Sequence, residues 1–153
     1  MKNISLLTKE EIDYLAKADT FRRDMFFKNR RDRHAKSVFD VDKRIMDIFL
    51  SIGISAHLQG YQYLRESIKM IMEHPEYING ITKTLYPKVA NKFATTACRV
   101  ERGIRHALEV SFSKGKMIFL NNIFGLEVLS HDERPTNSEF VALLADKLLL
   151  ESK

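Results

Sequence analysis

The chain has 153 residues, a formal net charge of +5, a hydrophobic fraction of 44% and one Cys, which suits one domain with an appendage. One Cys excludes an internal disulfide framework, no apolar run approaches the roughly 20 residues that span a bilayer, and the N-terminus lacks the apolar stretch of a secretory signal. We therefore expect a cytoplasmic protein with no membrane partner, whose positive charge permits binding to nucleic acid.

The first predicted helix runs from about residue 8 to 36 and begins with a capping box of Thr8 and Glu11. Residues 1–37 hold 10 basic and 6 acidic side chains. We interpret 1–37 as a basic helical extension and 38–153 as the main domain. Two interpretations of the extension stay open: a solvated tether, or an arm that contacts phosphate or a second copy of the chain.

Two further helices are predicted from residue 42 to 51 and from 61 to 73, because each has apolar residues at helical spacing. The residues expected to face inward are Val41, Ile45, Ile48, Phe49 and Ile52 for the earlier helix, and Leu64, Ile68, Ile71 and Met72 for the later one. Gly53 suits the end of the earlier helix, where a left-handed residue is common. His74-Pro75 stops the later one, because a residue before proline resists the helical conformation. With few glycines and prolines elsewhere, the chain is predicted to be all-α.

A helix-turn-helix pattern follows, with a short helix from 87 to 93, a tight turn, and a long helix from about 96 to 113. Pro87 suits the first turn of the short helix, and Thr95 or Thr96 is expected to cap the long one. A small helix is predicted near residues 117–124. The last helix should begin at a capping box and turn four apolar residues inward: Thr136 and Glu139, then Phe140, Leu143, Leu144 and Leu148.

The long helix has an apolar side and a polar side. The apolar side comprises Ala97, Val100, Ile104, Ala107, Leu108 and Ser111. The opposite side comprises Cys98, Arg102, Arg105 and Glu109, flanked by Arg99, Glu101 and His106. An arginine fork can bind guanine O6 and N7 or a phosphate, and a glutamate can accept a hydrogen bond from cytosine N4. Two interpretations stay open here: a solvated basic face, or a recognition helix in the major groove of DNA.

Five runs of the sequence are distinctive: SAHLQGYQYLRESI, ITKTLYPKVANKF, TTACRVERGIRHALEV, NNIFG and RPTNSEFVALLADKL. Together they resemble the C-terminal effector domain of the stage-zero sporulation response regulator, the master transcription factor of endospore formation. The resemblance spans about residues 41–151, and its most specific pieces are residues 99–107 and 135–140. It implies a six-helix DNA-binding domain with a central helix-turn-helix and no cofactor.

The resemblance also implies particular contacts with a short DNA box resembling TGTCGAA, often read as tandem copies by two domains arranged head to tail. Base contacts are implied for Glu101, Arg102 and Arg105, with Cys98 on the same side in place of an expected serine. Contacts with the DNA backbone are expected from His57, Lys88, Lys92, Thr95, Thr96, Arg99 and His106. For His57 a hydrogen bond within its loop stays open as an alternative, and for the two lysines ordinary surface charge.

The small helix of the family is implicated in contact with the sigma subunit of RNA polymerase, and Phe124 matches it. Phe119 and Asn121 stand where serines are expected, Gln59 stands in place of a lysine, and Gly103 in place of an alanine. Gly103 should cost about 1 kcal/mol of helix propensity. The 40 residues before the effector domain are too short for a receiver domain, so phosphorylation control through one is not expected.

These observations predict a sequence-specific DNA-binding transcription regulator. The alternative is a protein that antagonises a full-length relative without activating transcription. An enzyme is not expected, because the sequence shows no nucleophile–base pair, no glycine-rich phosphate loop and no metal triad.

Overall fold

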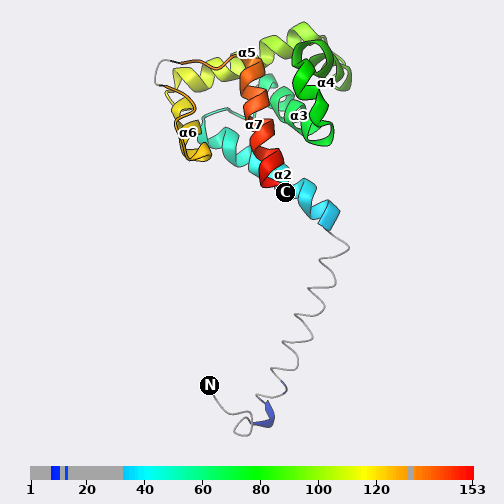
Figure 1. Cartoon of the computed structure of the whole chain (residues 1–153), viewed down its shortest axis with the longest axis vertical. Helices are drawn as coiled ribbons and strands as arrows, with labels where there is room; N and C mark the ends of the chain where they lie inside the picture. Colours follow the sequence, from blue (N-terminus) through cyan, green and yellow to red (C-terminus); the bar gives the residue numbers. More distant parts are fainter. Residues whose placement is uncertain (1–7, 11–12, 14–32, 131–132) are drawn as a thin grey trace. The chain divides into compact units, whose positions relative to one another are not determined.

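The structure, a computed structural model, describes residues 8–10, 13, 33–130 and 133–153 (Figure 1). The chain divides by its internal contacts into two units, residues 1–40 and 41–153. The predicted basic helix and its capping box lie almost wholly outside the described residues. Helix α2 extends from Arg33 to Ser51, so the predicted start near residue 42 was wrong. No glycine or proline stands between 33 and 51 to interrupt the helix earlier.

The second unit is helical throughout, and no strand occurs in the part of the chain that the structure describes, which confirms the all-α prediction. After α2 come α3 (Gln59–Glu73), a 3₁₀ turn η2 (Pro75–Gly80), a π-helical turn η3 (Ile81–Leu85), α4 (Tyr86–Lys92), α5 (Ala97–Ser113), η4 (Met117–Phe119), α6 (Leu120–Phe124) and α7 (Asn137–Glu151). Figure 1 shows α4 and α6 near opposite ends of α5, with α7 crossing between them.

One hydrophobic core unites these helices, with α3 packed against both α5 and α7 and α4 packed against α5. The predicted inward faces are confirmed for the residues that are almost fully buried: Ile45, Ile48, Phe49, Leu64, Ile68, Ile71, Val100, Ile104, Phe140, Leu144 and Leu148. Two predicted core residues, Met72 and Leu143, are only half-buried and lie at its edge. The buried Ser111 hydroxyl donates to the carbonyl oxygen of Ile52, which ties α5 to the end of α2.

Two glycines let α3 and α5 approach each other closely. A Cβ added to Gly60 would lie 2.0 Å from the carbonyl oxygen of Gly103 and 2.8 Å from the Cβ of Ala107. A Cβ added to Gly103 would lie 2.9 Å from the ring of Tyr63. The absence of side chains at both positions therefore fixes how near the long helix lies to α3.

Two helix starts are capped as predicted. The Thr96 hydroxyl oxygen accepts a hydrogen bond from the backbone N–H of Arg99 at 3.3 Å, at the start of α5. Thr136 and Glu139 form the reciprocal capping box of α7. These caps satisfy backbone donors that a helix leaves unpaired in its first turn, and so they define where each helix begins.

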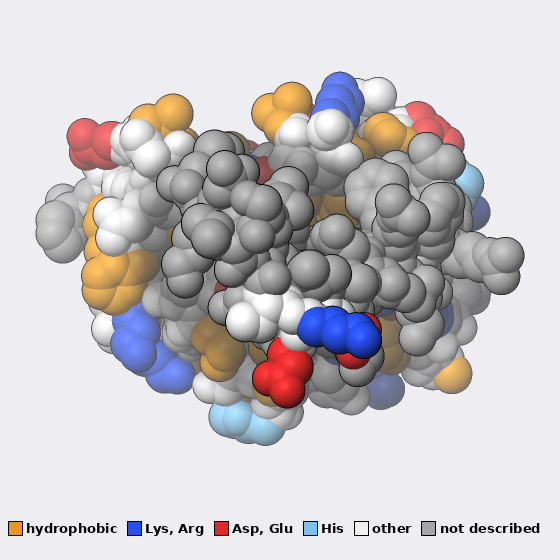
Figure 2. All heavy atoms as spheres, turned by 90° about the horizontal axis from the view of Figure 1, so that it is seen from below, with side chains coloured by type: hydrophobic (Ala, Val, Ile, Leu, Met, Phe, Trp, Pro, Cys, Tyr) orange, Lys and Arg blue, Asp and Glu red, His pale blue; other side chains and the backbone are white. Residues whose placement is uncertain are grey.

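Among the described residues, no helix is long and apolar enough to cross a membrane. The side chains coloured in Figure 2 are of mixed kinds, with acidic, basic and apolar groups interspersed over that face.

Candidate nucleic-acid interface

The helix-turn-helix is formed by α4 and α5 with residues 93–96 between them. Ala94 adopts a left-handed conformation, with φ of 50°, and the N–H of Thr95 donates to the carbonyl of Ala90 at 2.9 Å. The Phe93 ring packs edge-on against Tyr63 of α3, with 5.2 Å between ring centroids. The turn is thus held by backbone hydrogen bonds on one side and by an aromatic contact on the other.

The polar side of α5 is exposed to solvent, as the pattern predicted. Its exposed side chains are Cys98, Arg99, Arg102, Arg105, His106 and Glu109. Within the described part of the chain, Arg99 and Arg102 form no ion pair. Both guanidinium groups are therefore available to an external acceptor such as a phosphate or a base edge.

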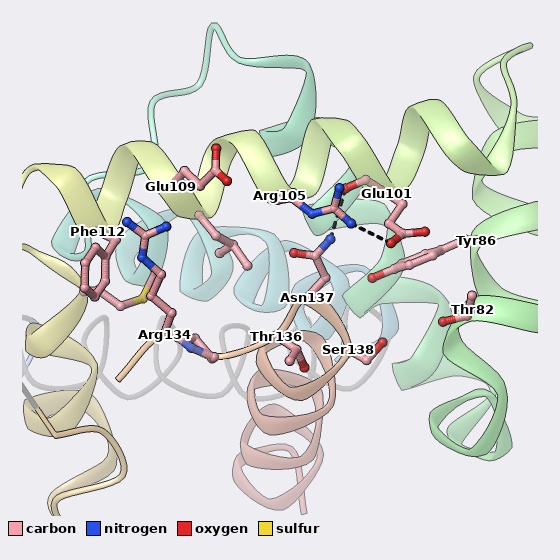
Figure 3. Close-up of a pocket in the computed structure, with 13 residues that line it drawn as sticks. Thr82, Tyr86, Glu101, Arg105, Glu109, Phe112, Arg134, Thr136, Asn137 and Ser138 are labelled. Carbon is pink, nitrogen blue, oxygen red and sulfur yellow. Dashed lines mark hydrogen bonds and ion pairs between the residues drawn. The ribbon is translucent and has the colours of Figure 1, made fainter. Parts of the chain in front are cut away.

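Glu101 and Arg105 differ from the other predicted contact residues because they bind each other. Arg105 Nη2 lies 2.8 Å from Glu101 Oε1, and these side chains are 54% and 40% exposed. Glu101 is half-buried, and its backbone carbonyl accepts a hydrogen bond from Asn137 Nδ2 of α7 at 3.0 Å (Figure 3). The pair therefore lies on the flank of α5 that faces the start of α7, rather than at the centre of the exposed face.

Several residues predicted to contact the DNA backbone have partners within the chain. Lys92 Nζ lies 2.6 Å from Glu66 Oε1, and Lys88 Nζ lies 5.5 Å from the centroid of the Tyr77 ring. Thr96 is occupied as the cap of α5. His57 is exposed in the segment between α2 and α3.

A hollow of about 410 Å³ brings together residues from three elements: Gln59 at the start of α3, Thr95 in the turn and Arg99 on α5. Two of these were predicted to contact the DNA backbone, and the third stands in place of an expected lysine. Nothing in the sequence indicated that they share one hollow, because Gln59 is remote from the other two along the chain.

The segment formed by η4 and α6 has one exposed aromatic residue, Phe119 at the end of η4, and one structural asparagine, Asn121 of α6. Phe119 is 44% exposed. Asn121 is half-buried, and its side chain accepts from the N–H groups of Val128 and Leu129 and donates to the carbonyl of Leu129. Phe124 is half-buried beneath Lys147, whose Nζ lies 5.2 Å from the ring centroid.

The sequence analysis missed a pocket between α5 and the start of α7, where Tyr86 and Arg134 lie at opposite ends (Figure 3). Both residues lie in runs that carry the family resemblance, but nothing in the sequence indicated that they line one pocket. The described residues hold no group of three His, Cys, Asp or Glu side chains that suits a metal ion.

A capped long helix with an outward arginine-bearing face, preceded by a short helix and a tight turn, defines a helical DNA-binding domain of the helix-turn-helix class. The sequence profile of the family described as "Sporulation initiation factor Spo0A C terminal" matches residues 45–148, which is most of the chain. The chain therefore belongs to this family of DNA-binding domains of sporulation transcription regulators, which is not a family of enzymes.

Proposed function

We propose that the chain reads a specific DNA box by placing α5 in the major groove. The observation that carries this proposal is the exposure of Arg99, Arg102 and Arg105 on a helix whose opposite side is buried in the core. The N-terminal half of a recognition helix presents its side chains to base edges, and these arginines lie in that half. The box is expected to resemble TGTCGAA, read singly or as tandem copies by two domains arranged head to tail.

Base contacts are assigned to Glu101, Arg102 and Arg105, with Cys98 beside them. The Arg105–Glu101 pair supports this assignment, because an exposed ion pair of this spacing contributes only about 0.3–0.5 kcal/mol. A correct bidentate base contact contributes about 1–3 kcal/mol of discrimination, so the pair can open on a matching box. On free protein the same pair holds the Arg105 side chain near its reading position.

Contacts with the DNA backbone are assigned to seven residues: His57, Lys88, Lys92, Thr95, Thr96, Arg99 and His106. The shared hollow of Gln59, Thr95 and Arg99 supports a phosphate position beside the turn. The basic extension, residues 1–37, is expected to add affinity without choosing the sequence, and removing it should flatten the salt dependence of binding.

The test compares Arg102→Ala and Arg105→Ala with Arg99→Ala as a matched control on the same helix. Binding to the box and to a scrambled duplex is measured by gel shift at one fixed salt concentration. The first two variants should lose about 5–150-fold for the box and little for the scrambled duplex, which corresponds to about 1–3 kcal/mol.

Arg99→Ala should weaken binding to both duplexes alike and reduce the slope of log affinity against log salt by about 1. Equal weakening of box and scrambled DNA by Arg102→Ala and Arg105→Ala would show that these residues do not read bases.

A second candidate function is antagonism of a full-length relative. It is favoured by the segment of η4 and α6, where Asn121 holds residues 128–129 and Phe119 is exposed, whereas serines were expected at both positions. Phe124 stays the proposed contact with the sigma subunit. A reporter with the box upstream separates the two functions, because an activator raises transcription while an antagonist occupies the box and leaves transcription low.

A further inference from the structure

A pocket of about 440 Å³ lies between α5 and the N-terminal end of α7. Figure 3 shows Tyr86 at one end of this pocket, Arg134 with Phe112 at the other, and the Arg105–Glu101 pair on the wall between them. Small-molecule sites commonly measure roughly 300–1,000 Å³ and contain a few convergent polar groups in an apolar lining. This pocket has the size of such a site, and its lining is more polar than usual.

The Tyr86 hydroxyl is a buried polar group without a hydrogen-bond partner among the described residues. Tyr86 is 1% exposed, and its hydroxyl has no hydrogen-bond partner in the part of the chain that is described. Burial and, after it, the negative charge of Glu101 raise the pKa of Tyr86 to about 12, while nearby Ser138 and Arg105 act in the opposite sense. Ser138 lies close, but the two hydroxyls do not meet hydrogen-bond geometry. The hydroxyl is therefore protonated at neutral pH and points into the pocket as a donor (Figure 3).

The charges around the pocket favour one negative charge on a ligand. The Arg134 guanidinium lies 4.3 Å from the centroid of the Phe112 ring and forms no ion pair within the described residues. The charge of Arg105 is already matched by Glu101. Glu109 also lines the pocket and would oppose a dianion such as phosphate. A monoanion is thus attracted by Arg134, since the start of α7 is already compensated by the Glu139 carboxylate of its capping box.

The rest of the pocket wall is mixed, with the polar side chains of Thr82, Thr136, Asn137 and Ser138 beside an apolar stretch. Leu108 and Met117 are 6% and 3% exposed, and Phe112 and Pro135 are half-buried beside them. A flat ring packed on this wall would remove apolar surface from water on both partners.

We propose that this pocket binds a small aromatic carboxylate, whose carboxylate pairs with Arg134 and whose opposite end offers a hydrogen-bond acceptor to Tyr86. The pocket shares Glu101 and Arg105 with the proposed base-reading surface, so an occupied pocket changes the affinity for the DNA box. The effect of an occupied pocket on DNA affinity rests on the proposed function, whereas binding of the carboxylate does not.

The probe is 4-hydroxyphenylacetate, which has a carboxylate at one end and a hydroxyl acceptor at the other. Titration of the full-length chain, followed by amide NMR shifts, should move Phe112, Asn137 and Ser138. A ligand of this size should give a dissociation constant on the order of 1 mM. The neutral amide of the same acid tests the charge, and phenylacetate tests the acceptor; each should bind about fivefold more weakly.

Tyr86→Phe and Arg134→Gln should each weaken binding of the probe about fivefold, while Lys43→Gln on exposed α2 should leave it unchanged. Tyr86→Phe removes only a hydroxyl without a partner, so its folded NMR spectrum should persist and the variant stays informative. Tyr86→Phe should also bind the probe and phenylacetate equally, because the acceptor then has no donor to meet.

Three results would overturn the proposal. The first is the absence of amide shifts at about 10 mM probe. The others are a neutral amide that binds as tightly as the probe, and Tyr86→Phe and Arg134→Gln variants that both bind the probe as tightly as the unaltered chain. Stronger shifts with inorganic phosphate would show that the pocket takes phosphate instead. For the proposed link between the pocket and DNA binding, saturating probe should change the affinity of the chain for the DNA box about fivefold. Unchanged affinity would refute that link. If the chain binds no box at all, the proposed function fails while the NMR titration still decides the ligand.

Discussion

Helices α3 and α5 cross at Gly60 and Gly103, and replacing each glycine by alanine should have a very different effect on stability. In Gly60→Ala, the new Cβ would lie 2.0 Å from the carbonyl oxygen and 2.6 Å from the carbonyl carbon of Gly103. Both obstacles are backbone atoms in the middle of a helix, so no side-chain rotation relieves them. The helices must separate and open the core at Leu64 and Ile104, which are fully buried.

Overpacking a core ordinarily costs about 1–3 kcal/mol, and here the obstacle is rigid, so we expect Gly60→Ala to lower the free energy of unfolding by at least about 3 kcal/mol. In Gly103→Ala, the new Cβ meets only the edge of the Tyr63 ring, at 2.9 and 3.0 Å, and a small ring movement relieves the contact. Alanine also gains about 1 kcal/mol of helix propensity there. The net change for Gly103→Ala should therefore stay within about 1 kcal/mol.

Urea unfolding followed by far-UV circular dichroism measures both changes. With a slope of about 2 kcal/mol per molar urea, Gly60→Ala should lower the midpoint by about 1.5 M, and Gly103→Ala by less than about 0.5 M. Equal midpoints for the two variants, or a loss below about 1 kcal/mol for Gly60→Ala, would refute the close crossing.

Three further predictions follow from single side chains. Because the folded state keeps the Tyr86 proton up to about pH 12, whereas the unfolded chain loses it near pH 10, stability should fall between these values by up to about 3 kcal/mol; unfolding measured against pH should lose this component in Tyr86→Phe. Thr96→Ala removes the cap of α5 and should cost about 1 kcal/mol, read from the urea midpoint; an unchanged midpoint contradicts the cap. Asn121→Ala should speed amide hydrogen exchange at Val128 and Leu129 about tenfold, since each loses an acceptor, and unaltered exchange there would mean that the loop is held otherwise.

Much of the site follows from short-range patterns. The buried side of α5, the Thr96 cap and the Thr136–Glu139 box were all predictable, because helical periodicity and capping depend on residues within one or two turns. The Arg105–Glu101 pair also had a local signal, since glutamate four residues before arginine is the favourable helical spacing. The family resemblance added the DNA-binding role, which charge and periodicity alone had left open.

The helix-propensity cost predicted for Gly103 is an estimate that the tertiary contacts change. As a residue inside a helix, glycine is unfavourable by about 1 kcal/mol relative to alanine. Against α3, however, the missing side chain leaves room for Tyr63, so much of the apparent gain from alanine is offset by a contact. Asn121 is a similar case, because the sequence showed only that it stands in place of an expected serine, whereas in the folded chain its side chain holds residues 128–129.

The sequence by itself determined that this chain is helical, where its long helix begins, and which arginines point away from the core. Only the tertiary structure decided that Gly60 meets Gly103, that Asn137 reaches the backbone of Glu101, and that the Tyr86 hydroxyl lies unpaired beside the proposed reading surface. The physical reason is the range of the interactions involved. Turns and faces are set by neighbours along the chain, whereas these contacts join residues far apart in sequence and exist only once the helices have packed.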